Sequence, residues 1–521
     1  MKKIQIIAMF ISTSLLLAGC NAPLSKSPKA GELAPSGHHT YWQLEGAAER
    51  IEKYRMGERK IVFTRNGEPV KNAEVEFDLK MHDFKFGVSL TQNWEDDTPR
   101  TELDSKYLKC IEETFNFLTV PTYWAWVERE GKDGPYNYNT LVRDNDEVIK
   151  WAKERGYTIK GHPLVWHSTL PKRILEMTDS AEVEEALKHH IQKLFADRSD
   201  LKMWDIYNES PAVTENHVTD NGIKRWVMSH CTENCVYQEC TDPECEGGEC
   251  KKPKNELNEP TKHKVYSHQD CIDVTTKKVY EWAHEYAPND DIIFVNNHYS
   301  DSYPMNHRTG KAKFYDMCDY FQKNNVDYDV IGIQTHMHEY GHLYTEEKMW
   351  NMLENYSKFG KPIQLSEVTV PGFEPFQGWQ DKGAHVQKGE EARRNHQPIP
   401  YREGDDSWKA FQAEYLVDFC TLGFSHPSVE AIIFWSLSDL NEWQYTTSGL
   451  LDVNDNPKPS YNAMNKLVNE TWHTNLVTKL NNNGSANLKG YYGVYTAMID
   501  GEKVEFKLTK DSPETINVEL N

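Results

Sequence analysis

Short apolar segments alternate with amphipathic segments through the centre of this 521-residue chain. Eight segments rich in β-branched and aromatic residues have the length of buried strands. They are residues 84–90, 115–120, 158–165, 202–208, 292–297, 330–335, 362–367 and 431–436. Amphipathic stretches that predict helices lie between them, at residues 139–155, 183–196, 275–286, 311–323, 346–359 and 408–422. This alternation predicts an α/β fold, a (β/α)8 TIM barrel with its site at the carboxyl ends of the strands.

Alternation with a period of two marks both ends of the chain body. Residues 59–79 alternate around the turn sequence Asn66-Gly67, which predicts a β-hairpin. Residues 492–508 alternate in the same way around Asp500-Gly501. Because short β segments are marginal alone, we expect the two ends to pair into one small β-rich accessory layer beside the barrel.

The first residues have the order of a bacterial export signal. Two lysines precede an apolar run at residues 4–17, and Ala18-Gly19-Cys20 follows. Residues 17–20 resemble a lipobox, so Cys20 is the expected lipidation site; the alternative is an ordinary signal peptide with an incidental cysteine. We expect an exported protein that is lipid-anchored to a bacterial membrane, at the outer membrane or cell surface.

These patterns divide the chain into five parts. We predict a signal peptide at 1–19, a tether at 20–47, an N-terminal β segment at 48–80, the barrel at 81–470 and a C-terminal β segment at 471–521. The barrel contains a Cys-rich insertion at 229–272. The insertion follows the fourth strand, so we expect it beside the cleft, where it either contacts the leaving part of a glycan or only stabilises a long loop.

Six of the ten cysteines lie in or next to this insertion. They are Cys231, Cys235, Cys240, Cys245, Cys250 and Cys271. Export favours three disulfides over a metal site, and the spacing is not that of paired CxxC motifs. Six cysteines allow 15 pairings, between which the sequence does not choose. Cys110, Cys318 and Cys420 lie in helix-like segments and are expected to be buried thiols.

Charge narrows the class of ligand. The chain has 58 Lys and Arg against 80 Asp and Glu, a formal net charge of -22. This charge repels phosphate backbones, which argues against nucleic acid and anionic lipid as partners. Aromatic residues make up 12% of the chain, and their flat rings suit the apolar faces of a neutral sugar.

The predicted strands end in polar side chains, and two of them end in glutamate. Glu209 follows the fourth strand and Glu367 ends the seventh. Glycoside hydrolysis needs one protonated and one ionised carboxyl at one site, and a shared pocket separates their pKa values. Alone, two such glutamates are weak support, because a strand-end carboxylate is more often structural or metal-binding.

The neighbouring motifs make the interpretation specific. Residues 161–167 read Gly-His-Pro-Leu-Val-Trp-His, 204–209 read Trp-Asp-Ile-Tyr-Asn-Glu, 332–336 read Gly-Ile-Gln-Thr-His, and Phe-Trp-Ser-Leu-Ser-Asp at 434–439 precedes Trp443. Together they resemble glycoside hydrolase family 10, the endo-β-1,4-xylanase family, over roughly residues 84–467.

The resemblance implies a retaining double displacement on internal β-1,4 bonds of xylan or a similar glycan. It makes Glu209 the acid/base and Glu367 the nucleophile, about 5–5.5 Å apart. The substrate-binding residues that it implies are His162, Trp166, Asn208, Gln334, His336, Trp435 and Trp443. It implies a monomer that needs neither metal nor organic cofactor and whose partner is a polysaccharide or oligosaccharide.

The chain departs from the family pattern in three places. The second strand usually continues into Glu-Asn-x-x-Lys-Trp, which grips the sugar one or two units from the cleavage point, but residues 121–126 read Pro-Thr-Tyr-Trp-Ala-Trp. Thr369 replaces an aspartate, and residues 296–298 read Asn-Asn-His in place of Asn-Asp-Tyr. Two alternatives therefore stay open: hydrolysis of another β-linked glycan or glycoside, and a surface glycan-binding lipoprotein that has lost the chemistry.

Overall fold

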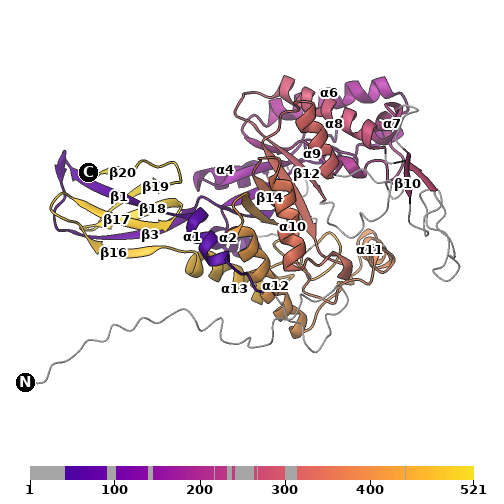
Figure 1. Ribbon diagram of the computed structural model, residues 1–521. Coiled ribbons are helices and arrows are strands. Elements are labelled where there is room, and N and C mark those ends of the chain that lie inside the picture. The colour runs from indigo at the N-terminus through magenta and orange to yellow at the C-terminus, as the bar shows by residue number, and fades with distance from the viewer. Residues whose placement is uncertain are drawn as a thin grey trace, which may run out of the picture.

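The computed structural model describes residues 42–90, 101–138, 145–215, 218–231, 237–240, 263–266, 268–299, 314–440 and 442–520. It has two parts, a barrel surrounded by helices and a β-sandwich at one end of it (Figure 1). Cys20 and almost all of the predicted signal and tether lie outside the described residues. No helix in the described ranges is both long enough and apolar enough to cross a membrane.

Eight parallel strands close the barrel, in the order that the sequence predicts. They are β4 (Lys85–Ser89), β5 (Phe117–Pro121), β6 (Thr158–His162), β8 (Met203–Asp205), β12 (Ile293–Tyr299), β13 (Val330–His336), β14 (Ile363–Thr369) and β15 (Val429–Phe434). Almost every residue of these strands is buried, because side chains fill the inside and helices cover the outside. The predicted (β/α)8 fold is confirmed.

The predicted helices are present, and the ends that can be compared agree within three residues, except that the helix predicted at 275–286 begins at residue 269. The predicted starts at 139–144 and 311–313 lie outside the described residues. In the described ranges, the helices between the strands are α2 (Thr101–Thr114), α3 (Trp124–Val127), α4 (Asn145–Glu154), α5 (Lys172–Glu176), α6 (Ser180–Asp197), α7 (Gly222–Ser229), α8 (Gln269–Tyr286), α9 (Phe314–Lys323), α10 (Glu346–Ser357), α11 (Trp379–Arg394) and α12 (Asp406–Ser425), followed by α13 (Pro459–Lys466). Side-chain caps fix several of their starts. Asp179 accepts hydrogen bonds from the first turn of α6, and Asp405 does the same for α12.

The third and fourth predicted strands are each split in two. β6 ends at His162, and β7 (Val165–Trp166) then pairs with β9 (Tyr207–Asn208), which follows β8 after a break. β7 and β9 form a separate two-stranded sheet, in which Trp166 is the register partner of Asn208. The split therefore brings two predicted site residues side by side above the barrel strands.

The accessory layer forms as predicted from both chain ends, as two four-stranded sheets. One sheet holds β1 (Met56–Arg65), β2 (Glu68–Pro69), β17 (Ser485–Tyr491) and β20 (Thr515–Leu520). The other holds β16 (Asn475–Lys479), β3 (Glu74–His82), β18 (Gly493–Ile499) and β19 (Glu502–Leu508). Figure 1 shows the first and last parts of the chain side by side in this layer.

The prediction that residues 59–79 form one β-hairpin is wrong in its second strand, because β3 does not pair with β1. The chain does turn at Asn66-Gly67 into an antiparallel pairing, but the returning strand β2 pairs with β1 at only two residues, the second of which is Pro69. Proline has no N–H to continue the ladder, and β3 instead enters the other sheet. Phe63 and Phe77 consequently face each other across the sandwich, with ring centroids 6.0 Å apart.

Residues 42–47, which the sequence assigns to the tether, contact the barrel helices. The indole of Trp42 packs against Tyr415. The backbone N–H of Leu44 donates to Glu346 Oε1 over 2.9 Å, and α1 (Ala47–Arg55) follows directly. An aromatic contact and a hydrogen bond to Glu346 therefore fasten residues 42–47 to the barrel.

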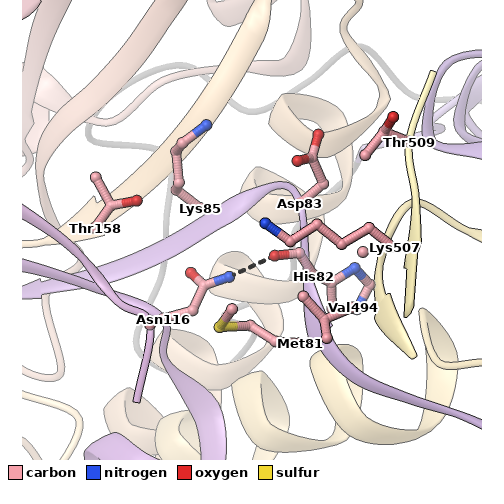
Figure 2. Close-up of a pocket in the computed structure, with 11 residues that line it drawn as sticks. Met81, His82, Asp83, Lys85, Asn116, Thr158, Val494, Lys507 and Thr509 are labelled. Atoms are coloured by element: carbon pink, nitrogen blue, oxygen red, sulfur yellow. Dashed lines mark hydrogen bonds between the residues drawn. The ribbon is translucent and has the colours of Figure 1, made fainter. Parts of the chain in front are cut away.

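A polar pocket of about 210 Å³ lies where the sandwich meets the barrel (Figure 2). Lys85 and Thr158, the first residues of β4 and β6, line it together with Lys507 from β19. Asn116 and His82 also line it, and the Asn116 amide donates to the His82 carbonyl over 2.9 Å. The pocket is thus at the amino ends of the barrel strands, away from the predicted site.

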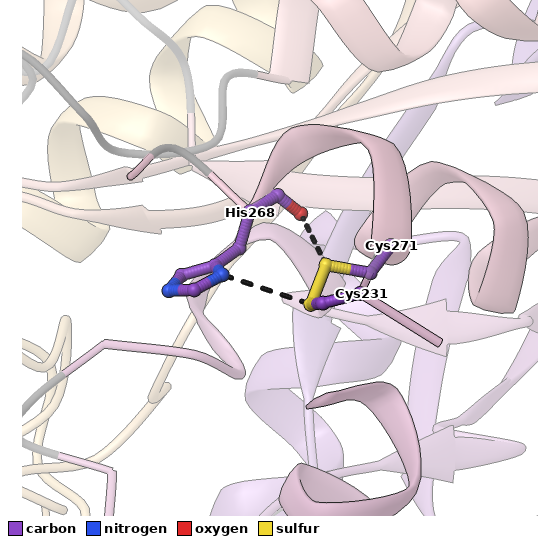
Figure 3. Close-up of side chains that lie close together, drawn as sticks. All are labelled: Cys231, His268 and Cys271. Carbon is purple, nitrogen blue, oxygen red and sulfur yellow. Dashed lines mark hydrogen bonds between the residues drawn. A yellow bond between two sulfur atoms is a disulfide. The ribbon is translucent and has the colours of Figure 1, made fainter. Parts of the chain in front are cut away.

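A disulfide closes the base of the insertion. Cys231, just after α7, is bonded to Cys271 in α8 (Figure 3). Within the insertion, β10 (Tyr237–Cys240) pairs with β11 (His263–Tyr266). His268 Nδ1 lies 3.6 Å from Cys231 Sγ, but the sulfurs are joined to each other and are not thiolate ligands for a metal. One disulfide of the three expected is therefore present, and the side chains of the other four cysteines lie outside the described residues.

The three cysteines that were expected to be buried thiols are so. Cys110, Cys318 and Cys420 lie in α2, α9 and α12, and none is in a disulfide. Burial raises the pKa of the Cys420 thiol above its ordinary value, so this side chain behaves as a small apolar group.

Candidate active site

Two glutamates lie at the carboxyl ends of the barrel strands. Glu367 is the third residue from the end of β14, and Glu209 directly follows β9. Glu209 has a left-handed backbone, with φ 53°, a conformation that costs a non-glycine residue about 1–3 kcal/mol. The Glu209 N–H donates to the Asn297 carbonyl over 3.1 Å, which helps to hold the residue in this conformation at the mouth of the barrel.

The Glu367 carboxyl is buried and is surrounded by polar side chains from two neighbouring strands. Its Oε1 accepts hydrogen bonds of 2.9 Å from Asn297 Nδ2 and from Gln334 Nε2. Its Oε2 lies 3.0 Å from His336 Nε2. Two amides and an imidazole thus fix both oxygens, and donors of this kind stabilise the ionised form of a carboxyl.

Glu209 has a different environment. It is only half-buried, and its Oε2 accepts a 3.0 Å hydrogen bond from Trp166 Nε1. Burial raises the pKa of Glu209 to about 7, and the negative charge of Glu367 adds to the rise. Burial and the charge of an ionised Glu367 thus both favour the protonated form of Glu209.

The pKa of Glu367 is also raised to about 7, again first by burial. The positive field of His162 and the hydrogen bond from Asn297 counteract this rise. Two buried carboxyls at one site titrate as a pair and not independently. Glu367 has more hydrogen-bond donors around it than Glu209, and these donors favour its ionised form.

Asn208 is held by the same amides that hold Glu367. Its Oδ1 accepts from Gln334 Nε2 over 3.0 Å and from Asn297 Nδ2 over 3.3 Å. Ser366 Oγ donates to Asn297 Oδ1 over 2.6 Å, which fixes the orientation of that amide in turn. The Asn208 NH2 group is therefore oriented before any ligand binds.

A buried ion pair supports His162. His162 Nδ1 lies 2.6 Å from Asp205 Oδ2, and Lys160 Nζ lies 3.0 Å from Asp205 Oδ1. Lys160 and Asp205 have fully buried side chains. The pair fixes the imidazole on the inner wall of the site, with Nε2 as its free edge.

Aromatic rings wall the site. Trp435 packs edge-on against His162, with ring centroids 4.8 Å apart. Trp443 lies beside His336 and His338, at 5.1 and 5.3 Å, and is 42% exposed. A tryptophan with one face on the protein and the other open offers a surface on which a sugar ring can stack.

The structure brings all nine of the predicted catalytic and substrate-binding side chains to this one mouth. It adds two that sequence reasoning missed. Asn297, noted only as a departure near the rim, bonds Glu367 directly. Its place at the end of the fifth predicted strand marks it as a strand-end amide but does not identify its partner. Tyr123 packs 5.6 Å from His162 and 5.5 Å from Trp166; as an unmatched residue in an altered motif, it gave no such signal.

This α/β barrel carries two carboxyls at its strand ends, and they differ in their hydrogen-bond donors. Such a pair can act as acid and nucleophile in the cleavage of a glycosidic bond. The class that this fold and site define is the barrel glycoside hydrolases. The sequence matches Glycosyl hydrolase family 10 over residues 78–232 and 258–467, well over half of the chain. The protein belongs to that family and is a glycoside hydrolase.

Individual relatives are distant. The chain is 24% identical to endo-1,4-beta-xylanase B of Thermotoga neapolitana over 374 residues, 70% of this chain and 84% of the relative. It is 20% identical to a beta-1,4-xylanase of Dictyoglomus thermophilum, over 68% of this chain and 82% of the relative. The structure is similar to that of xylanase 10C from Cellvibrio japonicus in complex with xylopentaose, with a TM-score of 0.51 and 18% identity over 75% of this chain and 68% of that one.

Proposed function

We propose that this protein hydrolyses internal β-1,4 bonds of xylan or a xylan-like glycan with retention of configuration, with Glu367 as nucleophile and Glu209 as acid/base. The names of the curated relatives point to xylan. The observation that carries the assignment of roles is the unequal hydrogen bonding of the two carboxyls. Glu367 has Asn297, Gln334 and His336 around it, while Glu209 has Trp166.

The proposed reaction has two displacements. In the first, a Glu367 oxygen bonds to the anomeric carbon, the bond to the leaving glycosidic oxygen breaks, and the Glu209 proton passes to that oxygen. In the second, Glu209 removes a proton from water, whose oxygen displaces Glu367 from the anomeric carbon. Glu209 is then protonated again, and Glu367 is again a carboxylate.

The remaining residues bind and orient the sugar. The Asn208 NH2 group is placed for the 2-hydroxyl of the sugar that is attacked, where a hydrogen bond strengthens in the transition state. His162 offers Nε2 from the inner wall. Trp435 and Trp443 provide apolar faces for the sugar rings.

Product analysis of the purified full-length chain tests this proposal. The substrates are linear xylan, glucuronoarabinoxylan and mixed-linkage β-glucan, and NMR follows the first anomer released. We expect xylo-oligosaccharides whose new reducing ends are first β. Glu367→Gln and Glu209→Gln should each lose at least about a thousandfold in kcat on xylan. Glu354→Gln, an exposed glutamate on α10, is the matched control.

The other outcomes are informative. Release of the α anomer first would overturn the retaining assignment. Activity only on the β-glucan would move the substrate to another β-linked glycan, which the altered residues 121–126 motivate. Binding of xylan without turnover would favour the glycan-binding alternative.

We further propose that the protein is attached to a bacterial membrane through Cys20. Mass analysis of the N-terminus after expression in a bacterium tests this, with a Cys20→Ala variant for comparison.

A further inference from the structure

Residues 121–126, at the end of β5 and just after it, lack the Glu, Asn and Lys side chains of the family motif. Thr122 is buried, and its Oγ1 donates to the Pro163 carbonyl over 3.0 Å, inside the protein. Pro121 and Ala125 have no polar side-chain atoms. The three positions that usually grip the sugar on the glycone side therefore offer no hydrogen bond to it.

Trp124, in the single turn α3 (Trp124–Val127), is also committed to the scaffold. Its ring stacks on His190, with centroids 4.1 Å apart, and its Nε1 donates to Glu128 Oε2 over 2.6 Å. Arg173 holds Glu128 through two further bonds of 2.6 Å. This tryptophan thus has no free face for a ligand.

Tyr123 is the residue of this segment that reaches the catalytic pair. Its ring lies against Trp166, which donates to Glu209, and against His162 and Trp126, the last at 4.5 Å. The side chain is 8% exposed. Burial, then the charges of Glu367 and Glu209, raise the pKa of its phenol. In the described part of the chain no residue hydrogen-bonds this hydroxyl, which leaves it for a ligand.

We propose that Tyr123 is a substrate-contacting residue that hydrogen-bonds the sugar next to the scissile bond, and that glycone recognition in this protein is concentrated on this one sugar. The inference rests on the proposed function. Pro121, Thr122 and Ala125 give the next sugar out no polar side chain, whereas Tyr123, His162 and Asn208 surround the first. The substrate class then includes β-glycosides with a single-sugar glycone, and a longer glycone adds little.

Aryl glycosides measure this directly, because their glycone length is fixed. We compare kcat/KM for an aryl β-xyloside and the matching aryl β-xylobioside. We expect the xylobioside to be favoured by less than about tenfold, since a site that does not hydrogen-bond the second sugar gains little from it. Tyr123→Phe should lower kcat/KM about tenfold on both substrates and leave their ratio unchanged.

A reciprocal variant supplies the missing contact. Ala125→Lys places a long hydrogen-bonding side chain at a half-exposed position of this segment, and it should raise the preference for the xylobioside about tenfold or more. Val477→Lys, on the exposed face of β16 in the sandwich, adds the same charge far from the site and should change neither rate.

Each outcome bears on a different claim. A wild-type preference for the xylobioside above about a hundredfold, or unchanged rates in Tyr123→Phe, overturns the inference. Cleavage of xylan with no turnover of the xyloside also overturns it and leaves the proposed function standing. Failure on xylan and on both aryl glycosides defeats the proposed function itself, and the inference falls with it.

Discussion

The imidazole of His336 lies between Glu367 and Thr369, and its Nδ1 is 2.8 Å from the Thr369 hydroxyl oxygen. A neutral hydroxyl thus stands where an acidic partner would favour a charged imidazole. Burial lowers the pKa of His336 to about 4, even though Glu209 and Glu442 act to raise it. His336 is therefore neutral at neutral pH and orients Glu367 by a hydrogen bond without adding positive charge.

Thr369→Asp should change the charge state of this histidine. A carboxylate against Nδ1 raises the pKa of His336, and the resulting imidazolium lowers the pKa of Glu367. The acid limb of the kcat/KM profile should move to lower pH, measured on an aryl β-xylobioside between pH 4 and 9. Thr369→Val, of the same size, should lower kcat about tenfold through loss of the hydrogen bond without that displacement. An acid limb that stays in place in Thr369→Asp would contradict this account of His336.

The pH profile of the wild type should be bell-shaped around neutrality. Burial raises the pKa of Glu209 to about 7, so the acid is lost as the pH rises through this value and kcat/KM falls on the alkaline side. The acid side falls as Glu367 takes up a proton. Glu209→Ala, assayed on an aryl glycoside whose leaving group needs no proton, should lack the alkaline limb. Persistence of that limb would assign it to another group.

The sequence predicted the barrel well because its signal is local: each buried strand is a continuous apolar run, and each helix has its own period. The site residues followed from the rule that strand ends converge. Partner choice in the sandwich was not predictable, because β1 and β3 have the same alternating pattern whether they share a sheet or face each other. Only the packing of Phe63 on Phe77 decides between the two arrangements.

Tyr123 and Asn297 show the same limit inside the site. The sequence identifies Asn297 as a strand-end amide, but its hydrogen bond to Glu367 depends on the register between β12 and β13. The orientation of Tyr123 depends on where Thr122 and Trp124 are anchored, which involves residues about 40 and 66 positions further along the chain. Such contacts are set by tertiary packing and leave no periodic trace.

Asp205→Asn should destabilise the barrel and alter its acid sensitivity. The buried Lys160 would lose its charged partner, a change that typically costs about 3–5 kcal/mol. Burial acts to raise the pKa of Asp205, but Lys160 and His162 lower it below its ordinary value overall. The stability from this group is therefore present above its unfolded pKa and is lost as the pH falls through the folded one.

Urea unfolding at pH 7 and at a series of pH values below 3.8, through the lowered pKa of Asp205, measures both effects. We expect the variant to lose stability at pH 7 and to lose less than the wild type on acidification. The control is Asp291→Asn, because Asp291 forms its ion pair with Lys202 on the exposed surface. This variant should change the free energy of unfolding by less than about 1 kcal/mol. An Asp205→Asn variant as stable as the wild type at pH 7 would mean that the buried pair contributes no net stability.

We expect the hydrogen bonds of Arg55 to be the main polar contact that holds the N-terminal segment against the barrel. Its Nε donates to the Phe424 carbonyl over 2.7 Å, and its Nη2 donates to the His426 and Val429 carbonyls over 2.6 Å each. Its guanidinium also lies over the Phe84 ring at 4.8 Å. Arg55→Met keeps the length and apolar bulk but leaves three carbonyls between α12 and β15 without this donor. We expect a loss of about 3 kcal/mol in the free energy of unfolding.

The control is Arg59→Met, because Arg59 bonds carbonyls of Lys510 and Ser512 at the partly exposed edge of the sandwich and does not reach the barrel. If Arg55 joins the N-terminal segment to the barrel, only Arg55→Met should speed amide hydrogen exchange in the turn between α12 and β15. The kcat on xylan should stay unchanged, because the candidate active site lies at the opposite end of the barrel strands. Equal exchange in the two variants would show that apolar contacts between sandwich and barrel suffice without the guanidinium.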